Sequence, residues 1–297
     1  MVRSSRRSGL TLVEVLVVLV IIVLLAILFF VMLLDMGVTH GRTLSPRTIC
    51  AANLKGTGNG IAIYAAANND CWPIPAHLPA EVDEVGRVRY APGKIGVKRG
   101  STGQPEAGAT TAEDVEMSTT RVFWQLIRAG TSSPKSFICP NSDDQPNDED
   151  NPQDFWDFRK YSEISYGYQI PFGKLGRPGP NVDQDMALMA DKGPFGAALE
   201  AGKPHPGTPK MTSTGSPNDW LPWNSPNHEG EGQNVLYADG HMDFVMTPLA
   251  GWKKDNIYTR WSRADADKDE NELARVQGTP PTGIETPWSD TDSFIYP

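Results

Sequence analysis

The chain has little positive charge and little cysteine for its length, and each shortage excludes a class of protein. Lysine and arginine number 27 against 36 acidic residues, so the basic surface that a nucleic-acid-binding protein needs is missing. Three cysteines allow at most one internal disulfide. Gly-x-Ser-x-Gly and phosphate-loop motifs are absent, and His228-Glu229 has no second histidine to complete a zinc-protease motif. The sequence therefore contains no motif that predicts an enzyme.

One apolar run dominates the amino terminus. Its twenty residues from Val15 to Leu34 carry no charge, and as a helix they would span about 30 Å, the thickness of a membrane's hydrocarbon core. A cleaved secretory signal has a shorter apolar region of about 7 to 15 residues, so we interpret the run as a transmembrane helix. The basic residues before it are Arg3, Arg6 and Arg7. The positive-inside rule therefore predicts a cytoplasmic leader and export of everything after Asp35.

The carboxylate of Glu14 lies just before this run. A carboxylate inside a membrane helix costs about 2.5 to 3.5 kcal/mol, so a plain signal anchor leaves Glu14 unexplained. The segment Gly9-Leu10-Thr11-Leu12-Val13-Glu14 resembles the class III leader of type IV prepilins and type II secretion pseudopilins. The resemblance implies that prepilin peptidase cuts between Gly9 and Leu10 and methylates the new amino terminus. Leu10 departs conservatively from the family, which usually has phenylalanine there.

The same resemblance gives Glu14 a role in assembly. Cleavage creates a positive amine at Leu10, and in the family the carboxylate is thought to meet the amine of a neighbouring subunit. Such a buried pair would set the axial register of stacked helices more surely than it would add stability. The alternative is a glutamate that only favours the first helical turn through the helix dipole and reaches toward the interface.

The rest of the chain divides into further segments. The complete division is a leader at 1–9, a transmembrane helix at 10–36, the outward half of the helix at 37–70, a globular head at 71–250 and an acidic carboxy-terminal tail at 251–297. Ser45 and Pro46 offer an N-cap followed by a proline at the first helical position, which predicts a new helix start. Beyond it, Gly56, Gly58 and Gly60 predict either a kink or the close approach of another element.

Several segments of the exported part resemble a large pilin-like family abundant in planctomycetes and their relatives. Cys50, Asn53 and Leu54 match the family's Cys-x-x-Asn-Leu-(Lys/Arg) segment. The next matches, in the same order as in the family, are Phe-x-Cys-Pro at 137–140, Ser-Tyr-x-Tyr at 165–168 and an apolar strand at 186–191. The resemblance implies an α+β fold in which a long amino-terminal helix packs against an antiparallel sheet. Independently of it, the apolar residues 122–127 predict a short buried helix that ends near Gly130.

The closing match lies near residue 240. His228, ten residues and then Asp239-Gly240 resemble the family's motif of histidine, nine residues and Asp-Gly, with one residue more. From physical chemistry alone, two apolar-rich runs around Asp-Gly predict a β-hairpin over 234–246, so turn chemistry sufficiently explains both turn residues. A metal site that gathers His228, Asp239, His241 and Asp243 is the alternative. We prefer a packed histidine and expect no metal there.

Calcium has a separate candidate in the acidic stretch 265–272. Asp265, Asp267 and Asp269 resemble the start of an EF-hand loop, but Glu270 stands where the loop needs glycine and Val276 offers no carboxylate. Some pseudopilins bind calcium in a carboxy-terminal loop, so the resemblance leaves a looser calcium site open. We prefer a solvated acidic tail and expect no cofactor.

The three cysteines, Cys50, Cys71 and Cys139, all follow the membrane run, where oxidation is possible. The resemblance implies a disulfide between Cys50 and Cys139, because both lie in family-like motifs and the bridge would tie the helix to the head. The alternative is three unpaired, buried cysteines.

These features predict a prepilin-like structural subunit of a type IV pilus or type II secretion pseudopilus, and not an enzyme. Its expected partners are prepilin peptidase, other pilin or pseudopilin subunits and the inner membrane, with no nucleic acid. The expected location is the inner (cytoplasmic) membrane, crossed once, with the head in the periplasm or at the cell surface. One alternative is an exported enzyme or ligand-binding protein tethered by the helix. Another is a minor pilin whose head binds surfaces or substrates at a filament tip.

Overall fold

The computed structural model describes residues 12–74, 81–82, 88–89, 119–148, 151, 157–158, 161–172, 175–195, 206–281 and 286–296. The chain divides into two compact units, Met1–Ser45 and Pro46–Pro297. The first unit contains the amino-terminal part of helix α1 (Leu12–Ala67). Its stretch Leu12–Phe30 is 19 residues long and apolar except for Glu14, and every side chain in it is exposed. By length and composition this stretch is able to cross a membrane.

Helix α1 continues through the position where a new start was predicted. Pro46 lies inside it, so the prediction of a helix start at Ser45 and Pro46 is wrong. A proline removes one backbone donor and crowds the carbonyl four residues earlier, which can bend a helix without ending it when both flanks are helical. The boundary between the two units nevertheless falls between Ser45 and Pro46.

The helix ends in a left-handed turn. Asn69 and Asp70 have φ angles of 55° and 58°, a conformation that short polar side chains tolerate better than others do. The backbone N–H groups of Asn68 and Asp70 both donate to the Ala65 carbonyl at 2.9 Å. Both bonds satisfy the same carbonyl, one of those left without a partner within the helix at its end.

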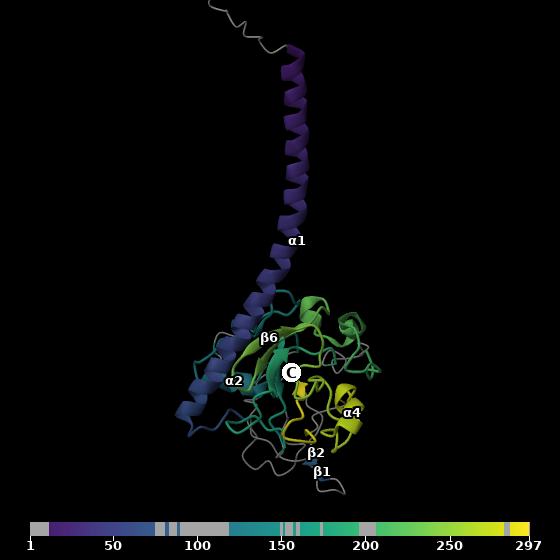
Figure 1. The fold of residues 1–297 in the computed structure, drawn as a ribbon. Coiled ribbons are helices and arrows are strands. Elements are labelled where there is room, and N and C mark those ends of the chain that lie inside the picture. Colours follow the sequence, from purple (N-terminus) through teal and green to yellow (C-terminus); the bar gives the residue numbers. More distant parts are fainter. Residues whose placement is uncertain are drawn as a thin grey trace, which may run out of the picture. The chain divides into compact units, whose positions relative to one another are not determined.

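A five-stranded antiparallel sheet forms the centre of the second unit (Figure 1). Its order is β6-β5-β4-β3-β7. The strands are β3 (Tyr166–Gln169), β4 (Ala187–Asp191), β5 (Gln233–Tyr237), β6 (Met242–Val245) and β7 (Ile295–Tyr296). The predicted strand at 186–191 and the predicted hairpin are confirmed by β4 and by the β5–β6 pair. Helix and antiparallel sheet together confirm the α+β fold class and are consistent with a pilin-like fold.

Short elements complete the second unit. The predicted buried helix is confirmed by α2 (Arg121–Arg128). The remaining elements are η2 (Pro134–Phe137), η4 (Tyr161–Glu163), η5 (Pro217–Trp223), η6 (Pro226–His228), η7 (Asp269–Asn271), α4 (Glu272–Val276) and a two-stranded sheet of β1 (Glu81–Val82) and β2 (Val88–Arg89).

Residues 46–67 of α1 pack closely on the sheet, next to α2 and the β5–β6 hairpin (Figure 1). Leu54 and Ile61 belong to the main apolar core together with Leu236 of β5. The second option predicted for the glycines, close approach of another element, is confirmed at Gly58, where an added Cβ would lie 2.7 Å from Leu236 Cδ2. Lys55 Nζ also donates to the Gly240 carbonyl in the hairpin turn.

The sequence predicted a separate acidic tail at 251–297, but its described residues, 251–281 and 286–296, fold into the head. Strand β7 pairs with β3, and Ile257, Trp261 and Phe294 are fully buried. The acidic residues gave a polar average to this stretch, but the aromatic and aliphatic residues between them supply the core around which it folds. The carboxy-terminal stretch is therefore part of the head.

Candidate functional site

The predicted processing residues lie at the amino end of the first unit. Gly9 and Leu10 fall outside the described residues. Glu14 lies in the first turn of α1 and is the one ionisable residue between Leu12 and Phe30. A carboxylate at this position is favoured by the helix dipole, and it introduces a single negative charge into an otherwise apolar surface.

The Cys-x-x-Asn-Leu segment places three side chains on the inner side of α1. Cys50 and Leu54 are four residues apart, so they share one helical face, and both are fully buried. Asn53 Nδ2 donates to the Ile138 carbonyl and to Tyr166 Oη, each at 3.2 Å. This segment therefore contacts the stretch around Cys139 through both an apolar core and a polar side chain.

The structure brings Cys50 and Cys139 together. Cys139 follows η2, and its Sγ lies 2.7 Å from Cys50 Sγ, with both side chains fully buried. Cys71 is exposed, so the alternative of three buried cysteines does not hold. The disulfide itself stays a prediction, because the two sulfurs are close without being bonded here.

His228 lies beside Asp191 in the same buried region. Its Nε2 is 3.1 Å from Asp191 Oδ2 and 3.2 Å from Asn234 Nδ2. Asp191 Oδ2 also accepts from the Asn234 backbone N–H at 2.6 Å, and Asp191 Oδ1 accepts from Asn227 Nδ2 at 3.3 Å. Burial lowers the pKa of His228, but the hydrogen bond to Asp191 and the charge of that carboxylate outweigh it and raise the pKa overall.

Together these side chains form a cluster of possible metal ligands. Cys50, Cys139, Asp191 and His228 each offer one ligand atom, all within 4.8 Å of one another, and all four residues are buried. From its position in the sequence, Asp191 was predicted only to end a strand. The sequence shows only that an aspartate ends an otherwise apolar strand. That pattern does not indicate that Asp191 contacts His228, which lies 37 residues later.

Of the other metal set considered from the sequence, three residues lie together and His228 does not. His241 Nδ1 is 2.5 Å from Asp239 Oδ1, and His241 Nε2 is 3.9 Å from Asp243 Oδ2. Asp239 and His241 flank the hairpin turn at one end of β5, whereas His228 precedes the opposite end of that strand. Asp239 Oδ1 accepts from the His241 backbone N–H at 2.9 Å, and Gly240 has a φ angle of 85°. Turn geometry therefore accounts for Asp239-Gly240, as the Asp-Gly signal indicated.

The acidic stretch 265–272 has cationic partners within the chain. Asp265 pairs with Arg263 and Lys268, and these cations with a backbone hydrogen bond lower the pKa of Asp265. Arg275 Nη1 donates to the carbonyls of Ala266 at 2.8 Å and Lys268 at 3.2 Å. The buried guanidinium thus uses carbonyl oxygens of the kind that calcium would need.

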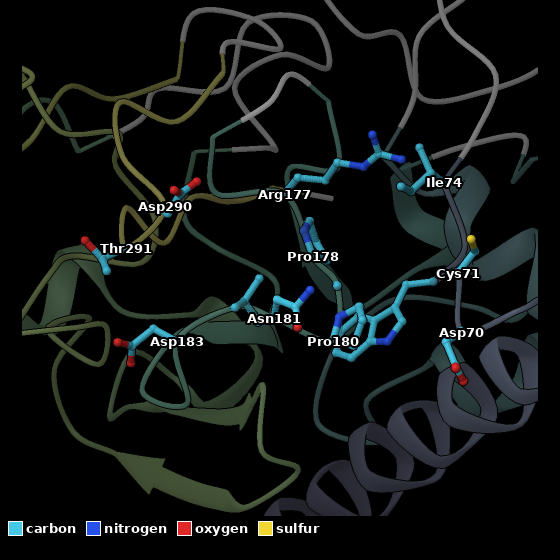
Figure 2. Close-up of a pocket in the computed structure, with 13 residues that line it drawn as sticks. Asp70, Cys71, Ile74, Arg177, Pro178, Pro180, Asn181, Asp183, Asp290 and Thr291 are labelled. Atoms are coloured by element: carbon cyan, nitrogen blue, oxygen red, sulfur yellow. The ribbon is translucent and has the colours of Figure 1, made fainter.

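A separate cavity of about 770 Å³ opens beyond the end of α1 (Figure 2). Its lining combines the apolar Trp72, Pro178 and Pro180 with the charged Arg177 and Asp290. The residues come from three stretches of the head, at 70–74, 177–183 and 290–291. A mixed lining of this kind suits a polar ligand with an apolar face better than it suits a metal ion.

Comparison with known proteins adds one match. A family model described as a prokaryotic N-terminal methylation motif matches residues 4–30. No curated protein and no solved structure matches the chain. The matched stretch contains Gly9, Leu10 and Glu14, whereas the resemblance of the head to a planctomycete-type family stays a prediction. The chain therefore carries a prepilin-type methylation motif that continues into an apolar helix suited to membrane anchoring.

Proposed function

We propose that the chain is a prepilin-like structural subunit, cleaved by prepilin peptidase between Gly9 and Leu10 and methylated at Leu10. The mature subunit assembles with other pilin or pseudopilin subunits into a type IV pilus or a type II secretion pseudopilus. The observation that carries this proposal is the methylation motif at residues 4–30, which overlaps the exposed apolar helix.

Glu14 supports the proposal through its charge. Cleavage would leave a positive amine at Leu10, four residues before the carboxylate and in the same apolar layer. Each charge alone is unfavourable in that layer, whereas an amine and a carboxylate from neighbouring subunits neutralise each other. The pair therefore favours one axial register between helices, which is the property that a filament subunit needs.

The proposed location follows from the same segment. Arg3, Arg6 and Arg7 precede the apolar stretch, so the leader stays in the cytoplasm and the head is exported across the inner membrane. An excess of 36 acidic over 27 basic residues supports protein and membrane partners over nucleic acid. In the head, the buried ionisable side chains of Asp191 and His228 are used in internal hydrogen bonds, which supports a structural role.

Co-expression with a prepilin peptidase tests the proposal. Wild type, Gly9→Ala and Glu14→Ala are compared by intact mass and amino-terminal sequencing. We expect wild type to begin at methylated Leu10, Gly9→Ala to remain uncut, and Glu14→Ala to be cut but to fail in filament assembly. Asp35→Asn, which removes a carboxylate beyond the other end of the apolar run, is the matched control and should assemble. An uncut wild-type chain would contradict the proposal.

A tethered ligand-binding protein is the second candidate. The cavity lined by Trp72, Arg177 and Asp290 favours it, because a cavity of about 770 Å³ has the size of a small-molecule site. In this case the apolar helix acts only as an anchor. The amino-terminal experiment separates the two candidates, since a tether retains Met1 and does not require Glu14.

A further inference from the structure

We propose that Cys50 and Cys139 form a disulfide that joins α1 covalently to the head. The two residues are 89 positions apart, yet their sulfurs lie 2.7 Å from each other in a fully buried site. Asn53, one turn along the helix, donates to the carbonyl of Ile138, the residue before Cys139. This hydrogen bond holds the two segments in the register that the bridge needs.

A metal ion is the competing use of the same sulfurs. A tetrahedral zinc site has zinc–sulfur bonds of about 2.3 Å, which places two cysteine sulfurs roughly 3.8 Å apart. The 2.7 Å between the two sulfurs in the structure is nearer to the disulfide bond length of about 2.05 Å than to that spacing. The two sulfurs are therefore placed for bonding to each other rather than for sharing an ion.

The remaining candidate ligands are already used. Asp191 Oδ2 accepts from the Asn234 backbone N–H at 2.6 Å and from Asn234 Nδ2 at 3.0 Å, while His228 Nε2 contacts the same oxygen at 3.1 Å. An ion would have to compete with these donors for Asp191. His228 and Asp191 instead bind to each other and to Asn234 beside the two sulfurs.

The bond forms by thiol–disulfide exchange with a disulfide-bearing oxidant in the exported compartment. Before the head closes, the still accessible Cys139 is the attacking thiolate. Cys139 bonds to one sulfur of the oxidant and the other sulfur leaves. Cys50 then loses its proton and displaces the oxidant, which ends as a dithiol carrying the two electrons. Because both sulfurs are buried, exchange precedes closure of the head.

The disulfide would transmit axial force. It links the helix to the stretch after η2, so a pull on the helix reaches the head through a covalent bond as well as through packing. The inference rests on the proposed export of the head, but it does not depend on removal of the leader. Gly9→Ala should therefore carry the same bridge, which separates a failure of this proposal from a failure of processing.

Alkylation of the full-length exported protein provides the test. The protein is denatured without reductant in an excess of a maleimide, and the adducts are counted by intact mass. We expect one adduct in wild type, located at the exposed Cys71, and none in Cys71→Ser. After reduction, the count should rise to three adducts in wild type and to two in Cys71→Ser. Peptide mapping without reduction should recover Cys50 joined to Cys139.

Three adducts without reduction, or a bridge that includes Cys71, would overturn the proposal. If no disulfide is found, measurement of bound zinc on the same sample distinguishes free thiols from a metal site. One zinc ion per chain would assign the four-residue cluster to a metal site. Reduction of the intact protein should also lower its thermal midpoint by about 10 °C, given a closed loop of this length. The alkylation count uses wild type, so it stays informative if Cys50→Ser fails to fold.

Discussion

Two stretches of the same helix differ in what they bury. Residues 12–30 of α1 are apolar on every side and exposed throughout, whereas residues 46–67 bury one face against the head. The buried positions Cys50, Leu54 and Ile61 recur with helical spacing. A helix that is apolar all round needs an apolar environment from outside the chain, here a membrane or neighbouring helices. A helix with one apolar face is stabilised by its own sheet.

We expect the largest difference between the two stretches of α1 when an aspartate is introduced into each of them. Ile21→Asp introduces a carboxylate in the middle of the apolar stretch, which costs about 3 kcal/mol of insertion free energy and should make the protein easier to extract from washed membranes than wild type. Ile63→Asp is the matched control, because Ile63 is 59% exposed on the outer side of α1. Surface substitutions of this kind change stability by about 0.5 kcal/mol or less. Extraction of Ile21→Asp no easier than that of Ile63→Asp would contradict the comparison.

Two glycines in the second stretch sharpen the comparison between its buried and exposed faces. An alanine at Gly58 would bring its Cβ within 2.7 Å of Leu236 Cδ2. Overpacking costs about 1 to 3 kcal/mol and the gain in helix propensity offsets about 1 kcal/mol of it, so we expect Gly58→Ala to destabilise the head by up to about 2 kcal/mol. Gly56 has no atom within 4 Å of an added Cβ, so Gly56→Ala should stabilise the helix by up to about 1 kcal/mol. Chemical unfolding of the head measures both. Equal effects of the same sign would show that the close approach is unimportant.

The sequence predicted the elements whose signals are local. The Asp-Gly turn between two apolar runs predicted the hairpin of β5 and β6, and a short apolar periodicity predicted α2. The glycines of α1 indicated a close contact because a missing side chain leaves room for a neighbour. In each case a few consecutive residues contain the whole signal.

The elements that depend on distant partners were missed. Strand β7 has two residues, too few for a recognisable pattern, and it forms only because β3 offers an edge more than 120 positions earlier. The pairing of Asp191 with His228 likewise requires β4 and η6 to meet in the folded head. Pro46 shows the reverse error, since a strong local signal for a helix start was overridden by helical flanks.

The two parts of the molecule also differ in their ionisable groups. Residues 12–30 contain one such group, whereas the head contains several that are buried. Burial raises the pKa of Asp292 to about 7, against hydrogen bonds from the Trp288 and Trp261 backbones and the charge of Arg260. The folded head therefore prefers the protonated acid, so this stabilisation is complete below the unfolded pKa of about 3.9 and is lost as the pH rises through 7. His228, whose pKa is also raised, contributes in the same direction.

We therefore expect the head to lose about 1 kcal/mol of stability between pH 6 and pH 8. The measurement is the thermal midpoint of unfolding across that range. Asp292→Asn cannot titrate, so its midpoint should depend less on pH even where the substitution lowers stability overall. Asp267→Asn, at an exposed position of the head, should keep the wild-type slope. A midpoint that rises from pH 6 to pH 8 would mean that the buried carboxyl is ionised in the folded head and that its backbone donors outweigh its burial.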